Sequence, residues 1–252
     1  MKRSFQVHGL MAMAAFGLAV VTAVPAQATV IVNGSFENKG TATNSFSISN
    51  PTVLPGWAAT PSGNKVLDCL VVAGETNKLC GTPNGWTLQF WNGGVGGAFA
   101  GGLSPDGGNY VAIDGDPGYA TPLTQTVTGL VVGNTYDISF YQAATQQFGF
   151  DGATTERWRV SLGSQSNLST LMSTPSHGYV GWMRQTLSFT AQNVSDTLTF
   201  LAIGTPNGVP PFVLLDGVSI KDTTPSPTPE PGTWAMVVAG GALLTLGRKR
   251  VK

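Results

Sequence analysis

The feature that most limits the fold of this sequence is an alternation of apolar and polar residues over short stretches. Between Thr135 and Tyr141, for example, Tyr136, Ile138 and Phe140 alternate with polar side chains. A period of two residues is typical of β-strands with one buried face, and clusters of glycine and asparagine between such stretches are typical of turns. Residues 29–221 show no helical periodicity. The pattern therefore predicts a single all-β domain of the β-sandwich type.

Several short segments have the composition expected of strands. They are residues 29–33, 66–72, 86–91, 109–114, 123–128, 135–141, 156–162, 186–190, 197–200 and 212–220. Residues 212–215 are apolar without interruption, which indicates a strand buried on both faces. Trp158 alternates with Val160 and Leu162, so we expect its indole in the core.

The N-terminus has the composition of a signal peptide. Two basic residues stand near the start, an apolar stretch runs from Leu10 to Val24, and Ala26-Gln27-Ala28 supplies a small-x-small cleavage pattern. Residues 1–28 are therefore expected to be removed on export, which leaves a mature chain beginning at Thr29. The alternative is a buried N-terminal helix.

The C-terminus carries an uncharged run followed by a basic cluster. As a helix, residues 232–247 would span about 24 Å, a little less than the roughly 30 Å hydrocarbon core of a bilayer. Positive charge at the end of the run orients that end toward the cytoplasm. We expect a transmembrane helix at 232–247 and a cytoplasmic tail at 248–252, joined to the β-sandwich domain (29–221) by a Pro/Thr/Ser linker at 222–231. A buried core helix is the alternative for the apolar run.

The order of elements in this tail is that of a known sorting signal. Pro229-Glu230-Pro231, the apolar run and then Arg248-Lys249-Arg250 resemble the PEP-CTERM signal. The resemblance implies export by a Gram-negative bacterium that makes extracellular polysaccharide, and processing near the tripeptide by a membrane enzyme of the exosortase type. The protein would then be anchored transiently before it reaches the cell surface or the extracellular space. The match is confined to the tail and implies no activity.

The charge of the expected mature segment excludes a nucleic-acid binder. Residues 29–231 contain seven basic and thirteen acidic side chains, a net charge of about −6. Proteins that bind nucleic acids show the opposite balance.

The chain has two cysteines, Cys69 and Cys80, which are eleven positions apart. Because an exported protein folds in an oxidising compartment, this pair predicts a local disulfide.

Three motifs of the central segment resemble the galactose-binding-like jelly rolls. They are Asn33-Gly34-Ser35-Phe36-Glu37, then Gly56-Trp57, and finally Leu215-Asp216-Gly217-Val218-Ser219-Ile220. That group includes many carbohydrate-binding modules and the DUF642-type extracellular domains. The resemblance implies a jelly-roll β-sandwich and a ligand that is a sugar.

The same resemblance implies a structural calcium ion where the first and last strands meet. Its matching positions here are Glu37 and Asp216, and the turn Asn38-Lys39-Gly40 could add backbone carbonyls. A lone carboxylate in the apolar run that contains Asp216 would be costly unless it were paired or bound to a metal. The alternative for Asp216 is a strand-end aspartate exposed to water.

Residues that could carry catalysis are few. The expected mature chain has one histidine, His177, and no Gly-x-Ser-x-Gly motif, whereas nucleophilic catalysis needs a base beside its nucleophile. We interpret His177 as a polar loop residue, with a Ser-His-Asp site as the alternative. Asp114 and Asp116 are the acids closest in sequence, and glycoside hydrolysis needs two carboxylates. The neighbouring turn residues favour a solvated turn or a minor cation contact instead, so we do not predict an enzyme.

Aromatic side chains remain as candidates for sugar binding, because sugar rings stack on flat amphipathic rings. Trp86 and Trp91 lie next to a glycine-rich segment, and Tyr119 follows a Pro-Gly turn. We select Trp86, Trp91 and Tyr119 as surface candidates, and core packing is the alternative for each.

The sequence therefore predicts an exported, non-enzymatic module that binds the exopolysaccharide of a biofilm matrix. Its expected partners are that polysaccharide, the exosortase-type enzyme and, before processing, the membrane. A structural or adhesion protein without a sugar site is the first alternative, and a polysaccharide hydrolase is the second.

Overall fold

The computed structural model describes residues 30–42, 46–50, 52–61, 67–73, 80–81, 87–91, 104–119 and 121–225. Within these residues every regular element is a β-strand. The expected signal peptide, Pro-Glu-Pro motif, membrane helix and basic tail lie outside them. In the part of the chain that the structure describes, no helix has the length and hydropathy required for a membrane crossing.

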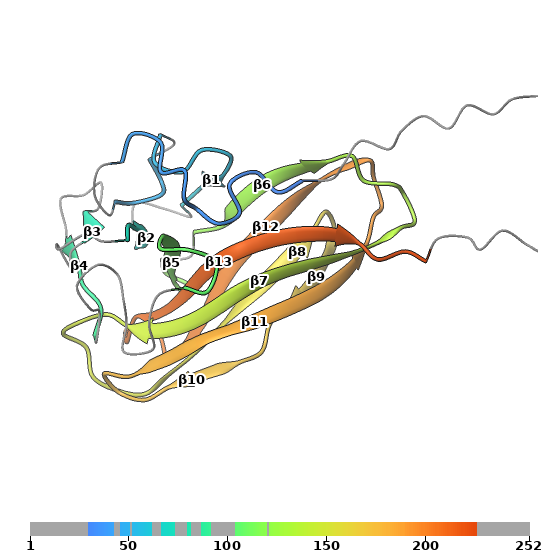
Figure 1. The fold of residues 1–252 in the computed structure, drawn as a ribbon. Helices are drawn as coiled ribbons and strands as arrows, with labels where there is room; N and C mark the ends of the chain where they lie inside the picture. The colour runs from blue at the N-terminus through green and yellow to red at the C-terminus, as the bar shows by residue number, and fades with distance from the viewer. Residues whose placement is uncertain are drawn as a thin grey trace, which may run out of the picture.

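Two antiparallel sheets pack against each other (Figure 1). The first has the order β1-β6-β12-β8-β10, with β9 also paired to β8. Its strands are β1 (Ala58–Ala59), β6 (Leu123–Thr128), β8 (Thr154–Leu162), β9 (Gln165–Leu168), β10 (Met172–Thr174) and β12 (Ser195–Thr205). The second has the order β11-β7-β13-β5-β2. Its strands are β2 (Asp68–Val71), β5 (Tyr110–Asp114), β7 (Thr135–Gln146), β11 (Tyr179–Thr190) and β13 (Pro211–Asp222).

A short ribbon of β3 (Cys80–Gly81) and β4 (Thr87–Leu88) completes the described strands. The whole arrangement confirms the predicted all-β class and matches a jelly-roll sandwich.

The main core lies between the two sheets, where the alternating apolar residues of both point inward. Trp158 is fully buried there, as predicted, and its indole Nε1 donates to the Leu214 carbonyl oxygen of the opposite sheet at 3.2 Å. Phe200 meets Trp158 edge-on, with ring centroids 5.8 Å apart, and meets Phe140 in the same way at 5.1 Å. The Phe200–Phe140 contact joins the two sheets, whereas Phe200 and Trp158 lie on neighbouring strands of the same sheet.

A second apolar cluster covers part of the outer face of the five-stranded sheet. Phe212 and Leu214 point into it, whereas Val213 and Leu215 point into the main core, and all four are fully buried. The prediction that residues 212–215 are buried on both faces is therefore confirmed. The predicted disulfide is also confirmed: Cys69 of β2 is bonded to Cys80 of β3, both within this second cluster.

The strand expected at residues 29–33 was wrong for the residues that the structure describes. Residues 32–35 form a turn, and Asn33 has a φ of 52°. The Asn33 side chain explains this, because its Oδ1 accepts from the Asn38 backbone N–H at 3.0 Å and its Nδ2 donates to the Asn38 carbonyl at 2.8 Å. A side chain that satisfies the local backbone removes the need for a neighbouring strand.

The sandwich has two distinct ends (Figure 1). The blue start and the red end of the described chain lie toward one end. The loop that follows β7 lies at the opposite end.

Candidate functional site

An open polar groove runs over the outer face of β11, β7 and β13. The strand register aligns outward-facing side chains in three rows across these strands: Ser188–Asp137–Lys221, Thr186–Ser139–Ser219 and Arg184–Tyr141–Asp216. The alternation of β7 explains the pattern, because Ile138 and Phe140 occupy the core while the residues between them face outward. The second apolar cluster covers another part of this face, and Asp216 is fully buried at the end of the third row. The open part of the face therefore lies along the first two rows and at Arg184 and Tyr141.

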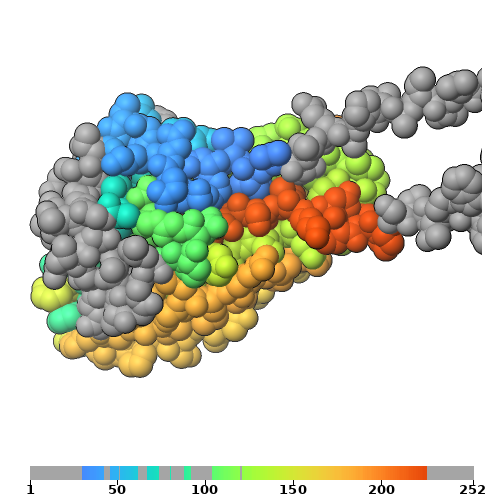
Figure 2. Space-filling view, in the orientation of Figure 1, coloured from blue at the N-terminus to red at the C-terminus, as the bar shows by residue number. Residues whose placement is uncertain are grey.

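Two hollows make up the groove. The larger, of about 500 Å³, is lined by Asp137, Ser139, Arg184, Thr186, Ser219, Ile220, Lys221 and Thr223. The smaller, of about 250 Å³, is lined by Asp106, Ser139, Phe140, Tyr141, Arg184, Gly217, Val218 and Ser219. Figure 2 shows atoms of β7 (yellow-green) reaching the surface between β11 (orange) and β13 (red). Arg184, Ser139 and Ser219 border both hollows.

The groove offers hydrogen-bonding groups of several kinds. The hydroxyls of Ser139 and Thr186 lie 2.8 Å apart, and Ser188 Oγ donates to Asp137 Oδ1 at 2.5 Å. Hydroxyls both donate and accept, the guanidinium of Arg184 only donates, and a carboxylate only accepts. Such a set can bind a chain of hydroxyl-bearing rings, which also donates and accepts at many points.

The second apolar cluster covers the sheet beyond the Arg184 row. Trp182, two residues before Arg184, packs against it and meets Tyr110 at a ring-centroid distance of 5.4 Å. Tyr110 lies on β5, three strands away from β11, so this contact spans β7 and β13.

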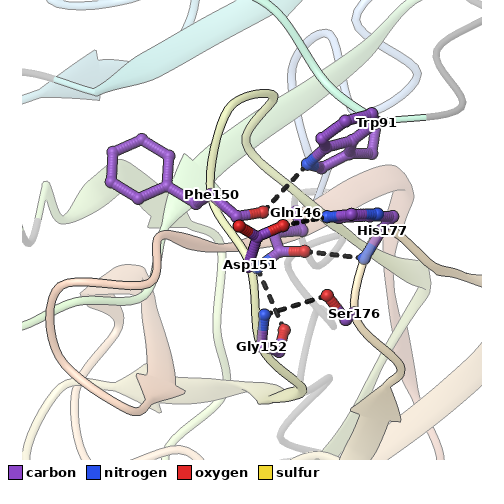
Figure 3. Close-up of polar contacts among 7 residues, drawn as sticks. All are labelled: Trp91, Gln146, Phe150, Asp151, Gly152, Ser176 and His177. Carbon is purple, nitrogen blue, oxygen red and sulfur yellow. Dashed lines mark hydrogen bonds and ion pairs between the residues drawn. The ribbon is translucent and has the colours of Figure 1, made fainter.

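A second surface feature is a group of rings at the loop end of the sandwich (Figure 3). The His177 imidazole stacks on the Trp91 indole, with centroids 4.0 Å apart and planes at 28°, and Phe148 contacts the same indole at 4.4 Å. Trp91 Nε1 donates to the Phe150 carbonyl at 3.1 Å. His177 Nε2 lies 2.5 Å from Asp151 Oδ1. We call these five residues the loop-end cluster.

The buried Gln146 joins two of the three segments that carry this cluster, the β7–β8 loop and the β10–β11 loop (Figure 3). Its Oε1 accepts from the His177 backbone N–H at 2.8 Å, and its Nε2 donates to the Gly152 carbonyl at 3.1 Å. Gly152 in turn donates its N–H to Ser176 Oγ at 2.9 Å. His177 is a polar loop residue, as predicted, and it also makes the stacking and hydrogen-bond contacts of this cluster.

The three sugar-binding candidates are placed differently by the structure. One face of Trp91 is occupied by His177, and the exposed rings beside it are Phe148 (48%) and Phe150 (36%). Tyr119 packs against the second apolar cluster. Trp86 lies outside the described residues. Neither Trp91 nor Tyr119 lines the groove, and no sequence pattern singled out its Tyr141 and Arg184.

The expectation that Asp114 and Asp116 form a solvated turn was wrong, because both side chains are buried. Asp114 Oδ1 accepts from the Asp116 backbone N–H, and Asp116 Oδ2 accepts from that of Gly208, each at 2.8 Å. The loop is thus folded under the connection between β12 and β13. Burial raises the pKa of Asp114 to about 8. Both carboxylates serve the structure of the loop.

The residues of the predicted calcium site come together around one segment. Glu37 Oε1 accepts from the backbone N–H groups of Gly108 (2.8 Å) and Asn109 (3.0 Å). Asp216 is fully buried, which overturns the water-exposed alternative, and it accepts a hydrogen bond from Ser104 Oγ of the same segment. Burial raises the pKa of Asp216 to about 7, with smaller contributions from the charges of Asp106 and Glu37.

The arrangement of these carboxylates meets part of what a bound cation requires. Asp216 lies within the electrostatic reach of two other acids, and a cation would relieve that repulsion. However, no group of three or more His, Cys, Asp or Glu side chains within the described ranges is arranged to hold a metal ion. Backbone oxygens would have to supply the remaining ligands, so calcium binding at Glu37 and Asp216 stays a prediction.

Comparison with known proteins gives limited information. No family model matches the chain. A match of 242 residues is 27% identical to halomucin of Haloquadratum walsbyi and covers 91% of this chain but 2% of halomucin. The chain therefore spans a very small part of that relative's length.

Several solved structures have a related strand arrangement. TmCBM61 in complex with beta-1,4-galactotriose is 13% identical, with a TM-score of 0.36 over 76% of this chain and 99% of that chain. A CBM4 structure is 15% identical, with a TM-score of 0.33 over 77% and 99%. The CBM22-1–CBM22-2 tandem domain of Paenibacillus barcinonensis Xyn10C is 14% identical, with a TM-score of 0.40 over 83% and 49%. At such identities and scores, the likeness assigns neither a ligand nor a family to this chain.

Proposed function

We propose that this chain is an exported, non-catalytic protein that binds polysaccharide in the groove over β11, β7 and β13. The main observation behind the proposal is a difference between two parts of the outer face of the five-stranded sheet. One part is covered by the second apolar cluster, while the other stays open along the rows of Asp137 and Ser139 and at Arg184 and Tyr141. A long polymer fits an open groove along the strands better than it fits an enclosed pocket.

The proposal includes the destination of the protein. The signal peptide at 1–28 and the tail from Pro229 onward would direct export, processing by an exosortase-type enzyme and residence in the polysaccharide matrix of a biofilm. The tail resemblance supports this part of the proposal.

A structural or adhesive role without a sugar site is the second candidate. The exposed Phe148 and Phe150 rings favour it, because they give the loop end a small apolar surface that a protein partner could cover. In that case the loop-end cluster, and not the groove, would be the contact surface.

Affinity electrophoresis tests the first candidate against the second. It measures binding of the purified protein to a panel of soluble neutral and acidic polysaccharides. Thr186→Trp fills the larger hollow and should abolish binding, whereas the matched variant Phe148→Ala at the loop end should bind normally. Retention of binding by Thr186→Trp together with its loss in Phe148→Ala would place the site at the loop end. Release of reducing ends from any bound polymer would show a hydrolase instead.

A further inference from the structure

Arg184 is a cation in the groove that no acid of the described chain neutralises. Its side chain is exposed and borders both hollows. Within the described residues the one ion pair joins His177 to Asp151, so Arg184 has no carboxylate within 4.0 Å there. A guanidinium presents a planar fork of donors, which matches the two oxygens of a carboxylate.

The acids that border the groove are too far from Arg184 to replace a ligand. Arg184 is in register with Tyr141, and Asp137 lies four residues away along β7, which is about 13 Å in a strand. That separation exceeds the screening length of about 8 Å at physiological ionic strength. Asp137 also lies directly opposite Lys221 of β13, so charge is balanced within that row.

Asp106 borders the smaller hollow from the other side. It lies against Gly217 of β13, two strand spacings, or about 10 Å, from β11. Asp216, in the row of Arg184, is also on β13 and is fully buried. The β11 side of the groove therefore carries a local positive charge in a segment whose net charge is about −6. Because the segment as a whole is negatively charged, it does not attract anions in general. Binding of an anion beside β11 would therefore depend on Arg184 itself.

We propose that the groove selects polysaccharides that carry carboxylates, that is, chains containing uronic acids. Arg184 binds the carboxylate in a bidentate manner. The adjacent hydroxyls of Thr186 and Ser139 bind hydroxyls of the same or the next sugar. This inference rests on the proposed glycan-binding function and specifies the ligand class of the same groove.

Titration of the purified full-length protein with polygalacturonate and with its carboxyl-reduced counterpart tests the inference, because the two polymers share a backbone. The expected result is about tenfold or tighter binding of the acidic polymer, since a charge-assisted pair contributes more than a neutral hydrogen bond. Arg184→Gln should remove that preference, and Arg184→Lys should retain only part of it. Arg159→Gln, which removes an exposed charge from β8 of the other sheet, should change nothing.

Three results would overturn the inference. Equal affinity for both polymers would show that the carboxylate is not recognised. An unchanged preference of Arg184→Gln for the acidic polymer would show that the carboxylate is recognised at another place. Equally tight binding of dextran sulfate would show a general response to polyanions. If the protein binds neutral polymers without discrimination, only this inference fails, whereas failure to bind any polysaccharide contradicts the proposed function as well.

Discussion

The imidazole of His177 stacks on the indole of Trp91 with ring centroids 4.0 Å apart. The two residues are far apart in sequence, one just after β4 and the other in the loop between β10 and β11. Their contact therefore ties two loops together at the end of the sandwich that is remote from residues 30 and 225.

We expect His177 to stabilise the protein mainly through stacking on Trp91, and not through its ion pair with Asp151. Replacing His177 with Ala should lower the free energy of unfolding by about 0.5–1.5 kcal/mol, because an aromatic pair contributes that much beyond its buried area. His177→Phe should retain most of the stability, and Asp151→Asn should cost less, because the Asp151 side chain is 87% exposed. Chemical denaturation measures all three, and a larger loss in Asp151→Asn than in His177→Ala would contradict the expectation.

Loss of the Cys69–Cys80 disulfide should destabilise the second apolar cluster. A loop of this length contributes roughly 3 kcal/mol in the chain-entropy model. The double variant Cys69→Ser/Cys80→Ser should therefore melt at a clearly lower temperature than the parent, and a reducing agent should destabilise only the parent. Mass spectrometry of the exported protein should find no free thiol, and two alkylated cysteines without prior reduction would contradict the bridge.

The stability of the protein should fall as the pH rises from about 4 to 8. Burial raises the pKa of Asp114 from 3.8 to about 8 and that of Glu156 from 4.5 to about 7. The folded state thus holds these protons more tightly than the unfolded state. Their contribution is fully present below the unfolded pKa values and is lost as the pH rises through the folded ones.

Asp114→Asn tests this assignment, because the amide oxygen can still accept from the Asp116 N–H. Melting curves between pH 4 and pH 8, recorded with chelator present, should be flatter for Asp114→Asn than for the parent. Arg159→Gln, at an exposed position of β8, serves as the control and should keep the parental slope. A parental slope in Asp114→Asn as well would show that Asp114 is not responsible.

The sandwich itself was predictable because its strands are amphipathic and buried on one face or on both. The continuous apolar run at 212–215 and the alternation around Trp158 depend only on local sequence. The strand register is different, since it depends on pairing between distant segments. Arg184 therefore could not be placed beside Tyr141, or Tyr141 beside Asp216, before the sheet order was known.

Two local features also escaped the sequence patterns. The first half of β11 was missed because a bulge between Val180 and Met183 interrupts its alternation. Asp114 and Asp116 were expected in solvent because glycine and proline surround them. Their burial results from the distant connection between β12 and β13, which closes over that loop.

Calcium, if bound as predicted, should stabilise the protein through Glu37 and Asp216. The neighbouring carboxylates repel one another when Asp216 is ionised, and a cation removes that cost. At a calcium concentration of one hundred times Kd the gain would be about 2.7 kcal/mol. Chelator should therefore lower the melting temperature of the parent near pH 8, and Asp216→Asn should lose this response. A melting temperature that changes with neither chelator nor added calcium would contradict the predicted calcium site.

The basic residues of the tail should be required for processing. Replacing Arg248, Lys249 and Arg250 with glutamine should leave full-length precursor in the membrane fraction, because the sorting resemblance depends on these charges. Immunoblots of membrane and culture fractions measure the result, with Arg159→Gln as a charge-loss control elsewhere in the chain. Normal release of the triple variant would contradict the sorting proposal.

The position of β13 has a consequence for biosynthesis. This strand is the last of the described strands in the sequence, yet it lies in the interior of its sheet, between β7 and β5. A nascent chain that lacks residues 211–222 cannot join β5 to β7, and its apolar β5 and β2 residues have no completed sheet to enter. The domain must therefore fold after nearly all of it has been synthesised, by a slow route dominated by contacts between distant segments. Until then the unpaired edges must be kept from pairing with other chains, so assembly of this protein depends on the surroundings of the unfinished domain as much as on its own sequence.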